Sequence, residues 1–216
     1  KFRRARDVLR RSEKLFSEAA IPPILRECGF ENYFTEGQGE SVRCAKFAAK
    51  KAAETGSSLV LSGAVGTGKT HLAAAIAQAA LAQGRAAFFI SAIGYLERLQ
   101  STFEKKRTDL YTEMVDNVKA VSCLVLADLG AERPSAWTIA RLYDVINARV
   151  ERGIQTIVTT DYPNAPALIR RLESDPFGAR RIVSRLVSFG WLTMEGEDYR
   201  GKKHRIDVGN DAATLQ

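Results

Sequence analysis

One stretch of the chain has the residue types and the spacing of a phosphate-binding loop. The run Gly63-Ala64-Val65-Gly66-Thr67-Gly68-Lys69-Thr70 matches the pattern G-x-x-x-x-G-K-[ST] in full. In this pattern backbone amides curl around phosphate oxygens, and the N-terminus of the following helix adds its dipole. Lys69 would reach the β- and γ-phosphates, and the Thr70 hydroxyl would ligate Mg²⁺. The residues predicted to bind ATP or ADP here are Gly63, Val65, Gly66, Thr67, Gly68, Lys69, Thr70 and His71.

An acidic residue follows a second apolar segment. Asp128 comes directly after the apolar run Leu124–Ala127. P-loop proteins usually place an acid at the end of a neighbouring buried strand, where it helps to hold Mg²⁺. Burying an unpaired charge without purpose would be costly, which favours a functional role over a turn-capping one. We therefore predict that Thr70 and Asp128 form the metal site, with nucleotide binding as the chemistry and the reaction itself left open.

Strands and helices alternate around these two motifs. Strands are expected over 58–62, 86–90, 120–127 and 154–160, and helices over 41–54, 69–83, 93–103 and 137–152. Such alternation predicts an α/β fold with a central parallel sheet flanked by helices. Residues 163–190 are expected to be helical with breaks at Pro166 and at 176–178, and residues 191–194 and 205–208 to pair as a final hairpin.

The composition excludes several classes of protein. With 216 residues, 45% hydrophobic and 26% charged, the chain is neither collagen-like nor wholly disordered. Its longest mostly apolar uncharged stretch, Leu72–Leu81, is too short to span a bilayer, so no membrane association is expected. Three cysteines without C-x-x-C spacing form neither a disulfide framework nor a zinc site, which favours the cytoplasm. The net charge of +7 suggests a polyanionic partner.

Several motifs in order resemble a known family. Residues 66–72 (GTGKTHL), 124–132 (LVLADLGAE) and 157–161 (IVTTD) are similar to the AAA+ ATPases of the DnaC/DnaI helicase loaders. Further matches lie at 21–23 (IPP), 30–33 (FENY), 137–149 and 181–186, so the resemblance covers about residues 21–205. The IstB transposition helpers share the same core.

The resemblance implies a domain organisation and partners. Residues 21–208 would form the AAA+ ATPase domain, residues 1–20 a basic linker helix, and residues 209–216 a tail. Because the chain starts at Lys1 rather than Met, we expect an N-terminal domain to be missing from it. In this family ATP binds between neighbouring subunits, and the assembly binds single-stranded DNA and loads the replicative helicase.

Site residues carry over from the family position by position. Asp128 falls on the second acid of the Walker B pair, and Asp161 on the sensor-1 position beside the γ-phosphate. Arg185 matches the arginine finger, with Arg181 one turn earlier at the same interface, and Arg200 matches the sensor-2 arginine. The catalytic residues implied are Lys69, Asp128, Asp161 and Arg185.

Two positions depart from the family. Ala127 stands where the first Walker B acid is expected, and Asp161 stands where sensor 1 is usually Asn. One hypothesis is that Asp161 compensates by helping to bind Mg²⁺. The other is that the site binds nucleotide but hydrolyses it poorly.

A DNA contact is predicted in the stretch 91–119. This stretch matches the additional helix that the helicase loaders insert between the second strand and the Walker B strand. Tyr95, Lys105, Lys106 and Arg107 combine aromatic and basic side chains suited to a single strand. The alternative is an exposed helix whose apolar residues Ile93, Leu96, Leu99 and Phe103 face the core.

Three other functions compete with helicase loading. An IstB-like transposition regulator would share the core but act on duplex DNA and a transposase. A non-hydrolysing adaptor that binds ATP and recruits a partner is favoured by Ala127. A P-loop kinase of small substrates is disfavoured, because no acceptor pocket is recognisable in the sequence.

Overall fold

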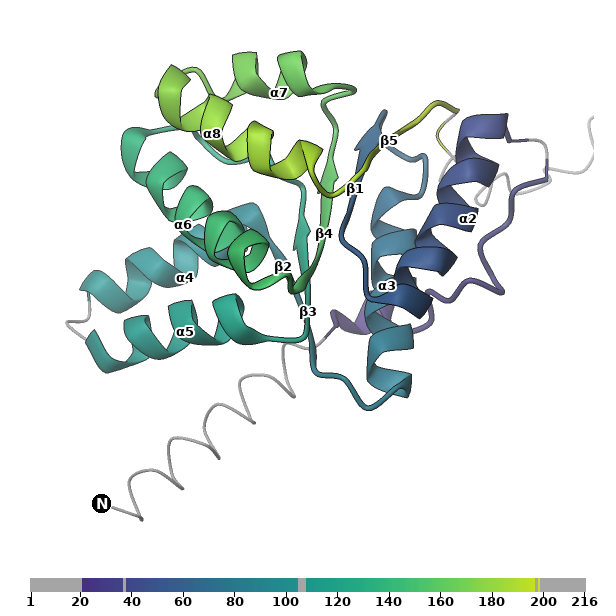
Figure 1. Ribbon diagram of the computed structural model, residues 1–216, viewed down its shortest axis with the longest axis horizontal. Coiled ribbons are helices and arrows are strands. Elements are labelled where there is room, and N and C mark those ends of the chain that lie inside the picture. The colour runs from purple at the N-terminus through teal and green to yellow at the C-terminus, as the bar shows by residue number, and fades with distance from the viewer. Residues whose placement is uncertain (1–20, 37, 105–107, 197, 199–216) are drawn as a thin grey trace, which may run out of the picture.

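A five-stranded parallel sheet forms the centre of the molecule (Figure 1). The computed structural model describes residues 21–36, 38–104, 108–196 and 198. The strand order is β2-β3-β4-β1-β5, with every neighbouring pair parallel. The strands are β1 (Leu59–Gly63), β2 (Ala87–Ser91), β3 (Cys123–Ala127), β4 (Gln155–Thr160) and β5 (Trp191–Met194).

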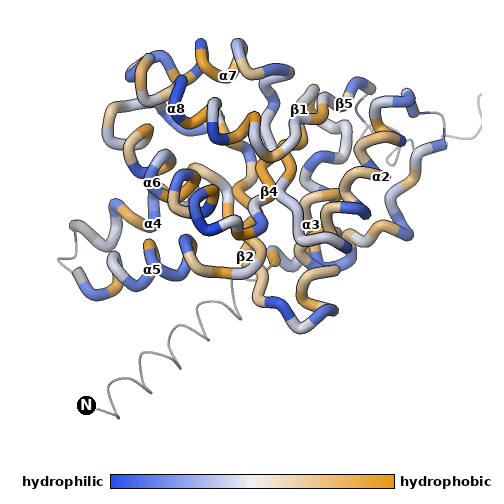
Figure 2. Tube along the Cα trace, viewed as in Figure 1, coloured by the Kyte–Doolittle hydropathy of each residue, from blue (hydrophilic) through white to orange (hydrophobic). Residues whose placement is uncertain are grey.

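Helices cover both faces of this sheet. Helices α2 (Glu40–Thr55) and α3 (Lys69–Ala82) lie on one face. The other face carries α4 (Ala92–Glu104), α5 (Thr108–Ala120), α6 (Ala136–Arg152), α7 (Ala165–Arg171) and α8 (Pro176–Val187). Because both faces are covered, β1, β3 and β4 are buried at every position. The apolar centre is visible along the strands and α3 in Figure 2. The predicted α/β P-loop fold is confirmed.

Polar caps set the starts of α6, α7 and α8. The Ser135 hydroxyl accepts a hydrogen bond from the Thr138 amide in a capping box at the start of α6. The side chains of Asn164 and Asp175 accept hydrogen bonds from the amides of Ala167 and Gly178 at the starts of α7 and α8. The predicted breaks are misplaced, because Pro166 and Pro176 lie in the first turns of α7 and α8. The amide hydrogens of a helix's first turn have no partner within the helix, so a proline, which lacks this hydrogen, fits there.

The last described strand joins the sheet instead of standing apart. Residues 191–194 form β5 as predicted, but β5 pairs in parallel with β1, with Leu61 opposite Leu192. The expected hairpin partner, residues 205–208, lies outside the described residues, as do the proposed linker 1–20 and tail 209–216. Within the described residues, every helix is too short or too polar to cross a membrane.

The topology brings three strand ends together. In a parallel sheet all carboxyl ends lie at one edge, and here β4 lies between β3 and β1. The loop after β1 therefore faces the residues that follow β3 and β4, namely Asp128 and Asp161. Ligands of open α/β sheets bind at this edge.

Candidate nucleotide-binding site

The loop between β1 and α3 has a backbone that only glycine can adopt at key positions. Gly63 and Gly68 have φ of 130° and 90°. A Cβ at Gly63 would overlap the Met194 carbonyl, and one at Gly68 would lie 2.6 Å from the Tyr33 ring. The two glycines thus allow a tight turn with close neighbours, and they leave the loop curled around an open centre.

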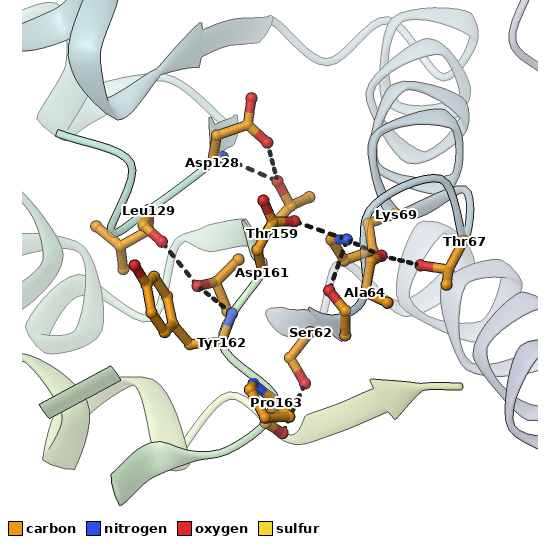
Figure 3. Close-up of polar contacts among 12 residues, drawn as sticks. Ser62, Ala64, Thr67, Lys69, Asp128, Leu129, Thr159, Asp161, Tyr162 and Pro163 are labelled. Carbon is orange, nitrogen blue, oxygen red and sulfur yellow. Dashed lines mark hydrogen bonds and ion pairs between the residues drawn. The ribbon is translucent and has the colours of Figure 1, made fainter. Parts of the chain in front are cut away.

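Lys69 lies buried inside this loop. Its side chain is 4% exposed, and its ammonium donates to the carbonyls of Gly63 at 2.8 Å and Ala64 at 2.7 Å. The third contact is an ion pair with Asp161, whose Oδ1 lies 2.9 Å from Nζ (Figure 3). Two of the residues predicted to be catalytic are therefore in direct contact.

A cavity of about 570 Å³ opens over the loop. The predicted residues from Val65 to His71 line one side of it, and Asp128 and Asp161 line it as well. Gly63 contributes its backbone carbonyl, which accepts a hydrogen bond from the Lys69 ammonium. The structure thus gathers the sequence-predicted phosphate and metal residues around one cavity, except Arg200, which lies outside the described residues.

Another side of the cavity was not predicted from the sequence. Residues Leu25, Asn32, Tyr33, Phe34, Gln38 and Val42 also line it. The Tyr33 hydroxyl donates to the Thr67 carbonyl at 3.0 Å, and its ring meets the His71 ring edge-on at 5.2 Å. Burial raises the pKa of Tyr33, so the phenol stays protonated. The sequence signal that could have revealed this wall was the segment 30–33 (FENY). It was noted as a match to the family, but no role was assigned to it.

The segment that carries Tyr33 is attached to α3. Gln78 donates from Nε2 to the carbonyls of Leu25 at 3.1 Å and Cys28 at 2.7 Å. The His71 Nε2 lies 2.8 Å from the Gly29 carbonyl. The phosphate-loop helix therefore holds both the loop and the aromatic wall of the cavity.

Asp128 stands at a sharp turn after β3. It has φ of 56°, and its amide donates to the Thr159 hydroxyl at 2.9 Å. The same hydroxyl lies 3.4 Å from Asp128 Oδ1. Asp128 is exposed to the cavity, so the argument from the cost of burial was wrong for this residue. Ala127, 1% exposed, places a methyl group at the position where the resemblance implies the first Walker B acid.

The buried carboxylate of Glu132 supports the turn that carries Asp128. Glu132 is 3% exposed and accepts a hydrogen bond from the Gly130 amide at 2.9 Å. Arg171 on α7 donates to the carbonyls of Gly130 at 2.8 Å and Glu132 at 2.7 Å. Burial raises the pKa of Glu132, while the nearby Arg171 charge lowers it by a smaller amount. This clamp fixes the turn that presents Asp128.

The two predicted interface arginines lie on α8, not among the cavity's lining residues. The Arg181 guanidinium stacks 3.9 Å from the Tyr143 ring centroid and donates to its hydroxyl at 2.6 Å. Arg185 donates from Nε to Asn147 Oδ1 at 2.9 Å. Both side chains are held against α6, which is compatible with action on a neighbouring molecule.

The structure corrects part of the predicted DNA contact. Tyr95 is 1% exposed within the core below α4, so its assignment to DNA binding is wrong. Ile93, which was expected in the core, is 39% exposed. Leu96 and Leu99 are buried as expected. Lys105, Lys106 and Arg107 lie outside the described residues, so their assignment stays a prediction.

Comparisons with known proteins agree with this geometry. The sequence model of the family described as IstB-like ATP binding protein matches residues 3–206. The replicative helicase loader DnaC of Buchnera aphidicola (strain Bp) is 24% identical over 198 residues, covering 89% of this chain and 77% of the relative. A crystal structure of the DnaC helicase loader superposes with a TM-score of 0.69 at 23% identity, covering 81% of this chain and 100% of that one. DnaI superposes with a TM-score of 0.70 at 21% identity, covering 81% and 95%. The AAA+ fold and the resemblance to the DnaC/DnaI loaders are confirmed.

Proposed function

Because the chain belongs to the IstB-like ATP-binding protein family, we propose that it is an AAA+ ATPase of DNA replication. It helps to load a replicative helicase onto single-stranded DNA in the cytoplasm. The observation that carries the proposal is the glycine cradle around Lys69, with Asp128 and Asp161 on the same cavity. The similarity to the DnaC loaders supports the choice of partner.

The residues present fit a magnesium nucleotide. A Cβ at Gly63 or Gly68 would collide with Met194 or Tyr33, so glycine is needed for the loop to curl. A loop curled in this way directs its backbone amides toward phosphate oxygens. Thr70 and Asp128 line the cavity as oxygen ligands of the kind that Mg²⁺ prefers. When bound, Mg²⁺ neutralises charge on the β- and γ-phosphates. Tyr33 and Phe34 offer an aromatic wall for the base.

Hydrolysis would use residues from two subunits. Asp128 is held at the end of β3 by Thr159, where it orients the attacking water. Arg185 from a neighbouring copy stabilises charge that develops on the γ-phosphate, with Arg181 beside it at the same interface. This arrangement requires self-association through the ATP sites. The basic cluster Lys105, Lys106 and Arg107 is proposed to track the DNA backbone.

The replacement at Ala127 favours a second candidate function, a weakly hydrolysing ATP-binding adaptor. Ala127 ends β3 in the core and supplies no ligand for the water shell of a metal. Turnover measured with and without DNA, and again in Ala127→Asp, separates the two functions. Brisk hydrolysis by the unchanged chain would exclude the adaptor. The alternative function is that of an IstB-like transposition helper, whose partner would be a transposase. The match to the IstB-like family favours this alternative.

The decisive experiment is a pull-down and loading assay with the replicative helicase. The unchanged chain should bind helicase and transfer it to single-stranded DNA in the presence of ATP. Lys69→Ala should lower ATP affinity about 10- to 100-fold, because a charge-assisted contact to phosphate is lost. Lys51→Ala, on an exposed position of α2, is the matched control. Absence of helicase binding, together with selective binding of duplex DNA, would overturn the proposal in favour of the transposition helper.

A further inference from the structure

Lys69 has a full set of partners within the protein. An ammonium group has three N–H donors. In this chain they meet the carbonyls of Gly63 and Ala64 and the carboxylate of Asp161, at 2.7 to 2.9 Å. Only Asp161 carries a charge, so it is the group that neutralises Lys69. A phosphate that approaches Lys69 must therefore replace a contact that already exists.

The carboxylate is placed where it competes with one particular phosphate. The loop amides hold the α- and β-phosphates inside their curl, and the lysine reaches the β- and γ-phosphates. The γ-phosphate therefore depends on the lysine, whereas the β-phosphate also has the loop amides. Asp161 follows β4, and its carboxylate lies beside the tip of Lys69 (Figure 3). A γ-phosphate bound to Lys69 would be next to this carboxylate, and two anions at such a distance repel each other.

A second carboxylate reaches the same loop. A Cβ at Gly66 would overlap the carboxylate of Asp198, so the Asp198 side chain lies directly against the loop backbone. Carboxylates of the protein thus contact the loop and its lysine from two directions. Asp161 forms an ion pair with Lys69, and its side chain is 53% exposed, so it can turn away into solvent without disturbing the core.

We propose that Asp161 selects nucleotides by the number of their phosphates. While Asp161 holds Lys69, a nucleoside diphosphate can still bind through the loop amides, whereas the γ-phosphate of a triphosphate lacks its contact with the lysine. A triphosphate binds only when the carboxylate moves aside or a divalent cation screens the repulsion. This inference rests on the proposed nucleotide binding and deepens it. It differs from the hypothesis that Asp161 is a ligand of Mg²⁺, because the two predict opposite effects of removing its charge.

The test compares affinities for ADP and for a non-hydrolysable ATP analogue, measured by calorimetry on the whole chain. Asp161→Asn keeps the size of the side chain and removes its charge. We expect it to raise the affinity for the triphosphate about tenfold in the presence of a chelator, and that for ADP less than twofold. The gain should be smaller with Mg²⁺, because the cation screens the carboxylate. Asp116→Asn, an exposed carboxylate on α5, makes the same change in net charge as a control and should leave the ratio of the two affinities unaltered.

Each outcome has a distinct meaning. A lowered affinity for the magnesium triphosphate in Asp161→Asn would overturn the inference and support a metal-ligand role. Equal changes for the two nucleotides would also overturn it, while the proposed function would stand. If the unchanged chain bound neither nucleotide at millimolar concentration, the proposed function itself would fail, and the inference with it.

Discussion

The Tyr33 hydroxyl donates a hydrogen bond to the Thr67 carbonyl at 3.0 Å, which joins the segment before the core to the middle of the phosphate loop. The same ring lies against Gly68 and His71. One aromatic residue therefore supports the loop and forms part of the cavity wall.

Substitutions at Tyr33 should separate these two roles. Tyr33→Phe removes only the hydroxyl and is expected to lower the free energy of unfolding by about 1 kcal/mol, with less than a threefold loss of nucleotide affinity. Tyr33→Ala also removes the ring and should weaken nucleotide binding at least about tenfold, because it opens a void beside Gly68. Denaturant unfolding and nucleotide titration provide the two readouts. An alanine variant with unchanged affinity would exclude Tyr33 from the site.

The buried carboxylate of Glu132 should make stability depend on pH. Its pKa is raised from the ordinary value of 4.5 by burial, so the folded state retains a proton that the unfolded state releases. The stability that this group contributes is complete below about pH 4.5 and is lost as the pH rises through the raised pKa. Glu132→Gln removes this dependence. The stability of the Glu132→Gln variant relative to the unchanged chain should therefore increase between pH 4 and pH 7, as measured by urea unfolding.

Glu173→Gln provides the control for that measurement. Glu173 is exposed after α7, so its substitution should leave the shape of the pH profile unchanged. Parallel profiles for the Glu132→Gln variant and the unchanged chain would show that Glu132 titrates normally.

Arg149 should be a major determinant of stability far from the cavity. It is fully buried and donates to the Thr156 hydroxyl and the Val118 carbonyl at 2.8 Å and to the Gln155 carbonyl at 2.5 Å. Burial lowers its pKa to about 10. Arg149→Met leaves these acceptors without their donor, and a loss of about 3 to 5 kcal/mol in unfolding free energy is expected.

The neighbouring Arg152 is the matched control for Arg149. It lies on the same helix but is exposed, so Arg152→Met should change the unfolding free energy by less than about 0.5 kcal/mol. Thermal or urea unfolding distinguishes the two variants. Equal effects would mean that the three hydrogen bonds of Arg149 contribute little.

If Arg185 acts on the neighbour's ATP, its loss should spare binding and remove hydrolysis. Arg185→Ala is expected to keep ATP affinity within about twofold and to lower DNA-stimulated turnover about 1,000-fold. Asn147→Ala removes only the group that orients Arg185 and should cost about three- to tenfold. Arg180→Ala, exposed on the same helix, should have little effect.

Mixing two inactive variants gives a sharper test of the arginine finger. Lys69→Ala subunits retain the finger, and Arg185→Ala subunits retain the phosphate loop. Mixed assemblies should therefore recover part of the activity that neither variant shows alone. No recovery in assemblies shown to contain both variants would contradict action between subunits.

The sequence predicted features whose signals are local. The phosphate loop is contiguous, and the buried strands read as short apolar runs, so their order along the chain sufficed for the fold. Pro166 and Pro176 were misread as breaks, because a proline signals both the end of one helix and the first turn of the next. Tyr95 was misread because its polar hydroxyl and helical position did not reveal which face of α4 packs on the sheet.

The contacts that complete the site are formed between residues far apart in the chain. Tyr33 and Thr67 are 34 positions apart, and Thr159 lies 31 positions after Asp128. The pairing of Lys69 with Asp161 depends on β4 lying beside β1, which the order of the strands along the chain does not specify. Such pairs appear only once the sheet is assembled.

Gln78 and His71 form hydrogen bonds with main-chain carbonyl groups of the segment before α2, those of Leu25, Cys28 and Gly29. A carbonyl is common to every amino acid, so these contacts are indifferent to the side chains at the three positions. The amino acids of this segment can therefore change during evolution while its hydrogen bonds to α3 are kept. Relatives of this chain could thereby reshape the outer rim of the cavity while leaving the phosphate loop untouched.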